Sequence, residues 1–562
     1  MSRLSTPALA LAALAALSLS ACLDHPVKQV EYETVSVLED IVEVYGNRNV
    51  DILFVIDNSG SMAEEQALLA KNFQAFIGEL DKVDANYRIG IVTTDNGNPR
   101  NPGSKFDGGD FRLSSCLDRL SADGGSGGDF IYGDFNAEFA CTDHCALHDA
   151  DIAIRPTTTD VDRDEAPRPW LESLYGVTNL PEAISVADAF QCFGPQGVTG
   201  SGFESPLESM YRALDKADDV GSANHGFLRS SAHLAVVFIT DEVDCSFNPE
   251  HIEIFQDNKA FWSDPELPLP TSAVCWNAGV QCMGSGPGFE GCEPADYDVS
   301  GAMTMIDDDA VLYPVSRYAG LLEAIRGQKQ AGDPSLQVMV AAIAGVPTGY
   351  EAGGVAIPYA ESADPEDQRE YWIGPGCTFN LDDGDPSNDS LARPPVRLRE
   401  LAEAFQVDER PGLYSICQDD YSGVLADLGE RIKDQLQPAC VRACVKDMDP
   451  KTPQIDPKCS VNEVLDGESE AMATCVVVDG ELAPPTGKTA CYSLLLDSSG
   501  ETSDPLDDMT KDEESGEYVC ASQGFDVEIK IVRTAPPRSG SEVRASCVLE
   551  ENARDYCPDL AD

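Results

Sequence analysis

The chain has 562 residues, with 98 acidic residues against 38 Lys and Arg, so its formal net charge is −60. This charge argues against a nucleic-acid-binding protein, because a phosphate backbone would repel such a surface. An apolar fraction of 42% argues against a disordered chain, and the length suits about two to four domains. We interpret the acidity as a solvated surface for a salty medium.

The first residues predict export. Arg3 is the only charged residue before position 22, and residues 8–19 form an apolar Ala/Leu stretch, which is typical of a secretory signal. No apolar stretch reaches the roughly 18 residues that a mature membrane-spanning helix needs.

The signal ends in Leu19-Ser20-Ala21-Cys22, which resembles a bacterial lipobox. The resemblance implies removal of residues 1–21 and lipidation of Cys22, whose acyl chains would anchor the protein. Leu23 stands where Asp is associated with inner-membrane retention, so the resemblance implies the outer membrane or the cell surface. Residues 22–48 would form a lipidated tether, which is expected to end in a short strand near Tyr45. An ordinary signal peptide with a chance cysteine is the alternative.

The cysteines divide into two even groups. Of the 19, setting Cys22 aside leaves ten between Cys116 and Cys417, and eight between Cys440 and Cys557. Each group could therefore close its own disulfides in an oxidising compartment. Their pairing cannot be read from the sequence. The division predicts a domain boundary near residue 438.

Strands and helices alternate over residues 49–438. A run at 50–56 that is apolar apart from Asp51 is typical of a strand covered on both faces, and Leu69–Leu80 follows with helical spacing. The later elements are, in order, a strand at 88–92, a helix at 207–214, a strand at 234–239, a helix at 315–325, strands at 336–343 and 413–417, and a helix at 424–436. The alternation predicts an α/β fold with a doubly wound, mostly parallel sheet.

Long insertions interrupt this alternation near residues 97–185, 245–305 and 350–395. After residue 438 the pattern changes, because stretches such as 473–478 and 525–532 carry alternating or β-branched residues between turn signals. Residues 439–562 are therefore predicted to form a small, Cys-rich β domain.

Oxygen-bearing side chains follow two of the predicted strands. Asp57, Ser59 and Ser61 occupy alternate positions directly after the first strand, and Asp241 follows the strand at 234–239. Ligands of open α/β sheets bind at the carboxyl ends of the strands. Hard oxygen donors suit Mg²⁺, or Mn²⁺ or Ca²⁺. A capped strand–helix turn without an ion is the alternative.

These motifs resemble the von Willebrand factor type A family, including its Cys-rich exported members. Its DxSxS loop and ITD strand end are matched by Asp57, Ser59, Ser61 and Asp241. The resemblance covers roughly residues 49–436. It implies a metal-ion-dependent adhesion site, where an acidic residue of a partner completes the coordination of the ion.

The loop around residues 199–207 corresponds to the third metal-site loop of the family, and we call it the third loop. It departs from the family pattern. Aligning Ala213-Leu214 with the family places Glu204 where a threonine is usual, while Ser205 and Thr199 are further candidates. Glu204 would give three carboxylates around one ion. This would tighten cation binding and disfavour a partner's carboxylate through like-charge repulsion.

A second, zinc-like pattern is formed by Cys141, His144, Cys145 and His148. We favour disulfides for these cysteines, because the predicted compartment is oxidising.

The favoured function is therefore a lipid-anchored surface binding or adhesion protein without enzymatic activity. Its partner would be an unknown protein or surface ligand. The alternatives are an exported metal-assisted hydrolase and a structural envelope protein whose ion only braces the fold. The hydrolase is less favoured because no histidine lies near the ion-binding motifs.

Overall fold

A computed structural model describes residues 40–42, 44–45 and 48–562, apart from 102, 105, 121–127, 380–389, 408–409, 437, 453, 466–467, 479, 501, 503, 512–515, 536–541, 551–556 and 558–562. The predicted signal peptide, Cys22 and most of the tether lie outside these residues. Within the described residues, every helix is too short or too polar to cross a bilayer.

A seven-stranded sheet confirms the predicted α/β fold. Its strand order is β15 (Leu413–Ser415), β12 (Val338–Ala344), β9 (His233–Ile239), β3 (Asn49–Ile56), β4 (Asn86–Thr93), β7 (Leu171–Leu174) and β8 (Val177–Thr178). The strands from β15 to β4 are parallel. Because β3 and β9 are adjacent and pair Ile56 with Ile239, the motifs that follow them lie side by side at the carboxyl ends of the strands, which we call the carboxyl edge of the sheet.

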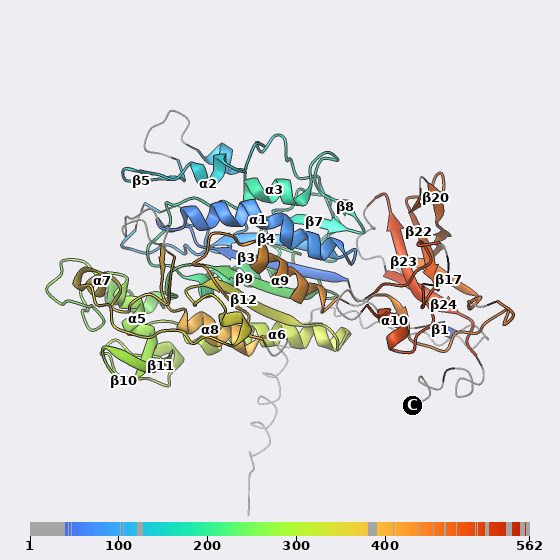
Figure 1. Ribbon diagram of the computed structural model, residues 1–562. Coiled ribbons are helices and arrows are strands. Elements are labelled where there is room, and N and C mark those ends of the chain that lie inside the picture. Colours follow the sequence, from blue (N-terminus) through green and yellow to red (C-terminus); the bar gives the residue numbers. More distant parts are fainter. Residues whose placement is uncertain are drawn as a thin grey trace, which may run out of the picture. The chain divides into compact units, whose positions relative to one another are not determined.

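Helices cover both faces of this sheet (Figure 1). On one face lie α1 (Ala63–Asp81), α3 (Val186–Phe193) and α9 (Ser422–Lys433), and on the other α4 (Pro206–Asp218), α6 (Val315–Gly332) and α8 (Val396–Ala404). Each face of the sheet has its own hydrophobic core, and alternate residues of β3 point into the two cores. Phe54 packs against Phe73 and Phe190 on the first face, and Leu53 belongs to the core on the second. Double-sided burial explains why β3 is apolar from Ile52 to Ile56, whereas the buried Asp51 pairs with Arg229 at 2.8 Å.

The insertions contain regular structure that the sequence analysis did not predict. The first ends in β7 and β8, which extend the main sheet as antiparallel strands, so residues 171–178 are part of the sheet and not of a loop insertion. The other short elements of the three insertions are η1 (Cys116–Arg119), β5 (Ile131–Tyr132), β6 (Phe135–Asn136), α2 (Phe139–Thr142), η2 (Pro249–Phe255), α5 (Ala273–Gly279), β10 (Val280–Ser285), β11 (Gly288–Pro294), η4 (Tyr350–Ala352), α7 (Pro365–Tyr371), β13 (Cys377–Phe379) and β14 (Ser390–Ala392). Between the second and third insertions lies η3 (Asp307–Asp309).

The C-terminal region is built from small sheets, as predicted. One contains β1 (Asp40–Val42), β24 (Glu542–Cys547), β17 (Cys459–Leu465) and β18 (Glu468–Ala471); another contains β19 (Ala473–Thr474), β22 (Ala490–Leu495), β23 (Glu528–Arg533), β16 (Cys440–Val441) and β2 (Val44–Tyr45). A hairpin of β20 (Val476–Val478) and β21 (Glu481–Ala483) and the short helix α10 (Val519–Ser522) complete it. The edge strands β1 and β2 come from residues 40–45, which the sequence analysis assigned to the tether.

Nine disulfides connect the cysteines at and beyond residue 116. Five pair residues before 438: Cys116–Cys141, Cys145–Cys192, Cys245–Cys275, Cys282–Cys292 and Cys377–Cys417. Four pair residues after it: Cys440–Cys520, Cys444–Cys557, Cys459–Cys547 and Cys475–Cys491. The two groups close separately, as their even counts allowed. This many disulfides indicates an exported protein.

Candidate metal centre

The DxSxS loop lies beside the end of β9. The backbone N–H of Asp57 donates to the carbonyl of Ile239 at 2.9 Å, and the Thr240 hydroxyl donates to Asp57 Oδ2 at 2.5 Å. The other carboxylate oxygen, Oδ1, accepts the backbone N–H of Ser59 at 2.7 Å. Parallel pairing of β3 and β9 therefore brings the two motifs into direct contact, at the edge where the sequence predicted a site.

The two serines and Asp241 form a row of oxygen atoms. Ser59 Oγ and Ser61 Oγ are 3.2 Å apart, and the Ser61 hydroxyl in turn hydrogen-bonds the Asp241 side chain. Asp57, Ser59 and Asp241 are buried, whereas Ser61 is exposed. The row thus runs from the sheet edge to the surface, which gives a ligand access to one end of it.

Glu204 lies at the same edge but is held by a residue that the sequence analysis missed. Its Oε2 accepts a short hydrogen bond from the Thr94 hydroxyl, directly after β4. The other candidates of this loop differ: the Ser205 hydroxyl donates to the Cys245 carbonyl at 2.9 Å, and Thr199 is half-buried. Glu204 is therefore the third-loop candidate whose carboxylate faces the carboxyl ends of the strands.

Burial makes the negative charge at this edge costly. It raises the pKa of Asp57 to about 6, against the hydrogen bonds from Thr240 and Ser59. Burial and then the charge of Asp57 raise the pKa of Glu204 and of Asp241 well above their usual range. The same causes raise the pKa of Glu242, a further neighbour, to about 8. A cation would favour the ionised form of each of these carboxyl groups.

Two buried oxygens support the fit of a cation. Asp241 Oδ1 and Glu204 Oε1 have no hydrogen-bond partner among the described residues. A buried polar atom without a partner is costly unless a ligand, water or ion satisfies it. Both atoms are hard carboxylate donors, which suit Mg²⁺, Mn²⁺ or Ca²⁺.

The three carboxylates alone do not form a compact ligand group. Within the described residues, trios of acidic or cysteine ligand atoms within 4.8 Å of one another occur at Cys116, Cys141 and Cys145, and at Asp497, Asp507 and Asp508. The first trio consists of disulfide cysteines. At the sheet edge an ion would therefore depend on the hydroxyls of Ser59 and Ser61 as well as on the carboxylates.

Gln66 of α1 connects the DxSxS loop to residues 196–197, which lead into the third loop. Its Nε2 donates to the carbonyls of Asp57 and Gly197, both at 2.8 Å. Its Oε1 accepts the backbone N–H groups of Gln196 and Gly197 at 2.8 and 3.0 Å. One buried side chain thus satisfies four backbone groups of two loops, which fixes their separation.

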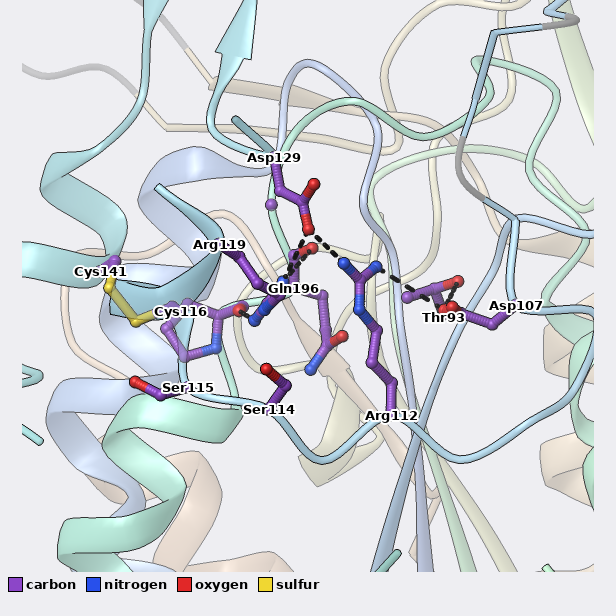
Figure 2. A network of polar contacts seen from close by, with 12 residues as sticks. Thr93, Asp107, Arg112, Ser114, Ser115, Cys116, Arg119, Asp129, Cys141 and Gln196 are labelled. Carbon is purple, nitrogen blue, oxygen red and sulfur yellow. Dashed lines mark hydrogen bonds and ion pairs between the residues drawn. A yellow bond between two sulfur atoms is a disulfide. The ribbon is translucent and has the colours of Figure 1, made fainter. Parts of the chain in front are cut away.

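The first insertion braces the third loop from outside (Figure 2). Arg119 donates to the carbonyls of Pro195 and Gln196 and contacts Asp129 at 3.3 Å, and Arg112 shares that carboxylate. The Asp129 carbonyl accepts the backbone N–H of Val198 at 2.7 Å. The insertion thereby holds residues 195–198, which lead into the candidate site.

The zinc-like pattern is not a metal site. Cys141 is bonded to Cys116 and Cys145 to Cys192, as the disulfide interpretation expected, so neither sulfur is a thiolate. His148 instead lies 2.9 Å from the carboxylate of Asp118.

Among solved structures, a pilus adhesin shows weak similarity to this chain. No protein-family model matches the chain, and no curated protein matches it. Two crystal structures of the pilus adhesin SpaC from Lactobacillus rhamnosus GG, one of them an open conformation, show weak similarity at 10% and 9% identity. The match covers 90% of this chain and 39% and 40% of the SpaC chains, with a TM-score of 0.25 in both cases. This chain thus spans about two fifths of SpaC, and at this TM-score the similarity carries no functional argument.

Proposed function

We propose that the chain is an exported binding protein that holds a divalent cation at the carboxyl edge of its sheet, as the resemblance to von Willebrand factor type A domains implies. Asp57, Ser59, Ser61, Asp241 and Glu204 would hold the ion, with Mg²⁺ expected and Mn²⁺ or Ca²⁺ possible by donor chemistry. The observation that carries the proposal is the buried Asp241 Oδ1, which lacks a partner among the described residues while its carboxylate contacts the Ser61 hydroxyl.

The ligand of this site would be an oxygen-bearing group that reaches the exposed end at Ser61. When bound, the ion would supply a positive coordination position for that group. Glu204 is buried and its Oε1 has no partner among the described residues, so its charge would partly offset that of the ion. We therefore expect ligands with neutral oxygens to be favoured over acidic ones, relative to a site with a threonine at this position.

Export with a lipid anchor is the second part of the proposal. The nine disulfides support export, and the lipobox-like Leu19–Cys22 supports attachment through Cys22 to the outer membrane or cell surface. Mass spectrometry of the N-terminal peptide tests it: an acylated Cys22 supports the anchor, and an unmodified N-terminus downstream of residue 22 contradicts it.

Calorimetric titration of the oxidised protein with Mg²⁺, Mn²⁺ and Ca²⁺ tests the cation site. We expect uptake of at least one ion, and at least a tenfold loss of affinity in Asp241→Asn, because one anionic donor is lost. Asp257→Asn removes an exposed acidic group elsewhere and serves as the matched control. Absence of uptake, or equal affinity of the two variants, contradicts the proposal.

A pull-down from envelope extracts, with and without EDTA, tests whether the ion takes part in partner binding or only stabilises the fold. If the ion presents the ligand, chelation and Asp241→Asn both abolish partner capture. Retention of every partner after chelation, together with a lower melting temperature, would instead indicate that the ion only braces the fold.

A further inference from the structure

A separate pocket of about 380 Å³ opens beside the candidate metal centre. Its wall is formed by the loop after β4, the first turns of α4 and residues 247–252, which include the start of η2. This volume lies within the range of small-molecule sites. The lining includes Asn96, Asn98, Ser104, Phe106, Glu208 and Arg212.

Three polar atoms of this lining are buried and lack a hydrogen-bond partner among the described residues. They are Asn96 Oδ1, which accepts, Asn98 Nδ2, which donates, and Ser104 Oγ, which can do both. Asn98 is only 4% exposed, and its Oδ1 is already used by the backbone N–H of Arg100 at 2.9 Å. Buried polar atoms without a partner are costly, so these three atoms favour a polar occupant over an apolar one.

The orientation of Asn96 is fixed. Its Nδ2 donates to Ser209 Oγ at 2.6 Å and to the Ser205 carbonyl at 3.2 Å, which leaves Oδ1 as the group available to an occupant. The acceptor and the donor of the pocket therefore belong to two different residues of one loop.

An exposed aromatic ring completes the pocket. Phe106 is 59% exposed, yet its ring packs against Gly97, where a Cβ would lie 3.1 Å from the ring. Gly97 has a φ of +77°, and its N–H donates to Asp95 Oδ1 at 2.8 Å, so the backbone beneath the ring is a defined turn. The ring thus offers an apolar face at low ordering cost.

The lining has no net charge, although the protein has a formal charge of −60. Glu208 and Arg212 form an ion pair at 3.0 Å. An anion would face Glu208 and Asn96 Oδ1, and a cation would face Arg212. A purely apolar ligand would leave the Asn and Ser atoms unsatisfied.

We propose that this pocket binds a neutral saccharide unit. A pyranose presents hydroxyls that both donate and accept, which match Asn96, Asn98 and Ser104, and a C–H face that can lie on Phe106. The site is independent of the cation, because none of its lining residues belongs to the proposed ion ligands.

Saturation-transfer NMR and calorimetry on the oxidised protein test this, with glucose, galactose, N-acetylglucosamine and their β-linked disaccharides as probes. We expect at least one saccharide to bind, and its affinity to fall at least tenfold in Phe106→Ala and in Asn98→Leu. Phe135→Ala removes another exposed ring, which is 43% exposed and does not line the pocket, and should have no effect.

The proposal is wrong if no saccharide binds, or if saccharide affinity is equal in Phe106→Ala and Phe135→Ala. It is also wrong if, of a wider set of probes, only the amide N-methylacetamide or a charged compound binds. Crystals soaked in saccharide that show water alone in the pocket would contradict it as well. Saccharide binding should also survive EDTA and Asp241→Asn. Loss of binding in both would contradict an independent site, whereas failure of cation uptake alone would affect only the proposed metal centre.

Discussion

Gly200 is the residue at which the third loop crosses the DxSxS loop. Its N–H donates to the Asn58 carbonyl at 2.8 Å, and a Cβ at this position would lie 2.3 Å from Asn58 Oδ1 and 2.7 Å from the Asn58 carbonyl oxygen. A contact with backbone cannot be relieved by a side-chain rotation. Glycine at this position therefore allows the two loops to approach closely.

Gly200→Ala should separate the two loops and weaken Mg²⁺ affinity at least tenfold, as measured by calorimetry. Gly202→Ala is a matched control, because nothing lies within 4 Å of a Cβ there. Equal affinities in the two variants would contradict a role for the close approach. Circular dichroism would verify that both variants fold.

His233 at the start of β9 makes stability depend on pH. Burial, followed by the nearby charge of Lys329, lowers the pKa of His233 to about 4, against the smaller effects of Asp333 and Asp51. Its Nδ1 accepts the backbone N–H of Gln337 at 3.1 Å, which requires the neutral ring. The unfolded chain therefore binds this proton first, so the contribution of His233 to stability is lost as pH falls from 6.5 towards 4.

Denaturant unfolding at pH 7 and pH 4 measures this effect. Between pH 7 and pH 4, the unfolding free energy of His233→Gln should fall by about 3 kcal/mol less than that of the wild type. This follows from 1.36 kcal/mol per unit of pKa. His144→Gln, a histidine substitution in the first insertion, is the control for general effects of removing a histidine. If His233→Gln shows the same loss as the wild type, the buried neutral ring is not the cause.

At the scale of elements, α1 orders the site through one polar side chain in its apolar stripe. Gln66 lies three and four residues before Leu69 and Ala70 on the buried face, and it is fully buried. Gln66→Leu preserves volume but leaves four backbone groups of the two loops without this partner. We expect a loss of at least about 2 kcal/mol in unfolding free energy and faster hydrogen exchange at Gln196 and Gly197.

Gln74→Leu is the matched control on the same helix, because Gln74 is exposed. It should leave the exchange rates of Gln196 and Gly197 unchanged. If Gln66→Leu also leaves them unchanged, another contact must position the third loop.

The elements of the main sheet could largely be predicted, because strands buried on both faces are continuous apolar runs and their helices have clear stripes. Strands β7 and β8 could not, since they are short, antiparallel and lie at the end of a Gly- and Asp-rich insertion. Thr94 was missed although it follows β4 just as Asp57 follows β3. Gln66 also had a signal, a polar residue at a stripe position, whereas the contact of Glu204 with Thr94 depends on tertiary packing.

At the scale of the whole molecule, covalent and non-covalent connections divide the chain differently. No disulfide among the described cysteines crosses residue 438. However, β2 pairs with β16, through Tyr45 with Cys440 and Val44 with Val441, and β1 pairs with β24. The strands before the main sheet therefore belong to the C-terminal sheets.

A protease site inserted after Pro438 tests this division. After cleavage, a non-reducing denaturing gel should show two fragments, because no disulfide joins them. Under native conditions the fragments should elute together in size-exclusion chromatography, because β1 and β2 complete the C-terminal sheets. A single band on the gel would contradict the disulfide pairing, and separate native peaks would contradict the strand pairing.

The pairing of β1 and β2 also determines how the protein would respond to mechanical force. If the segment before residue 40 is fixed to a surface and a ligand pulls at the carboxyl edge of the sheet, tension enters through β1–β24 and β2–β16. Cys440 and Cys547 on the partner strands are bonded to Cys520 and Cys459, so those strands are cross-linked against extension. The short pairings of β1 with β24 and of β2 with β16 would break first. The chain before the seven-stranded sheet would then lengthen, while that sheet and its ligand contacts stayed intact.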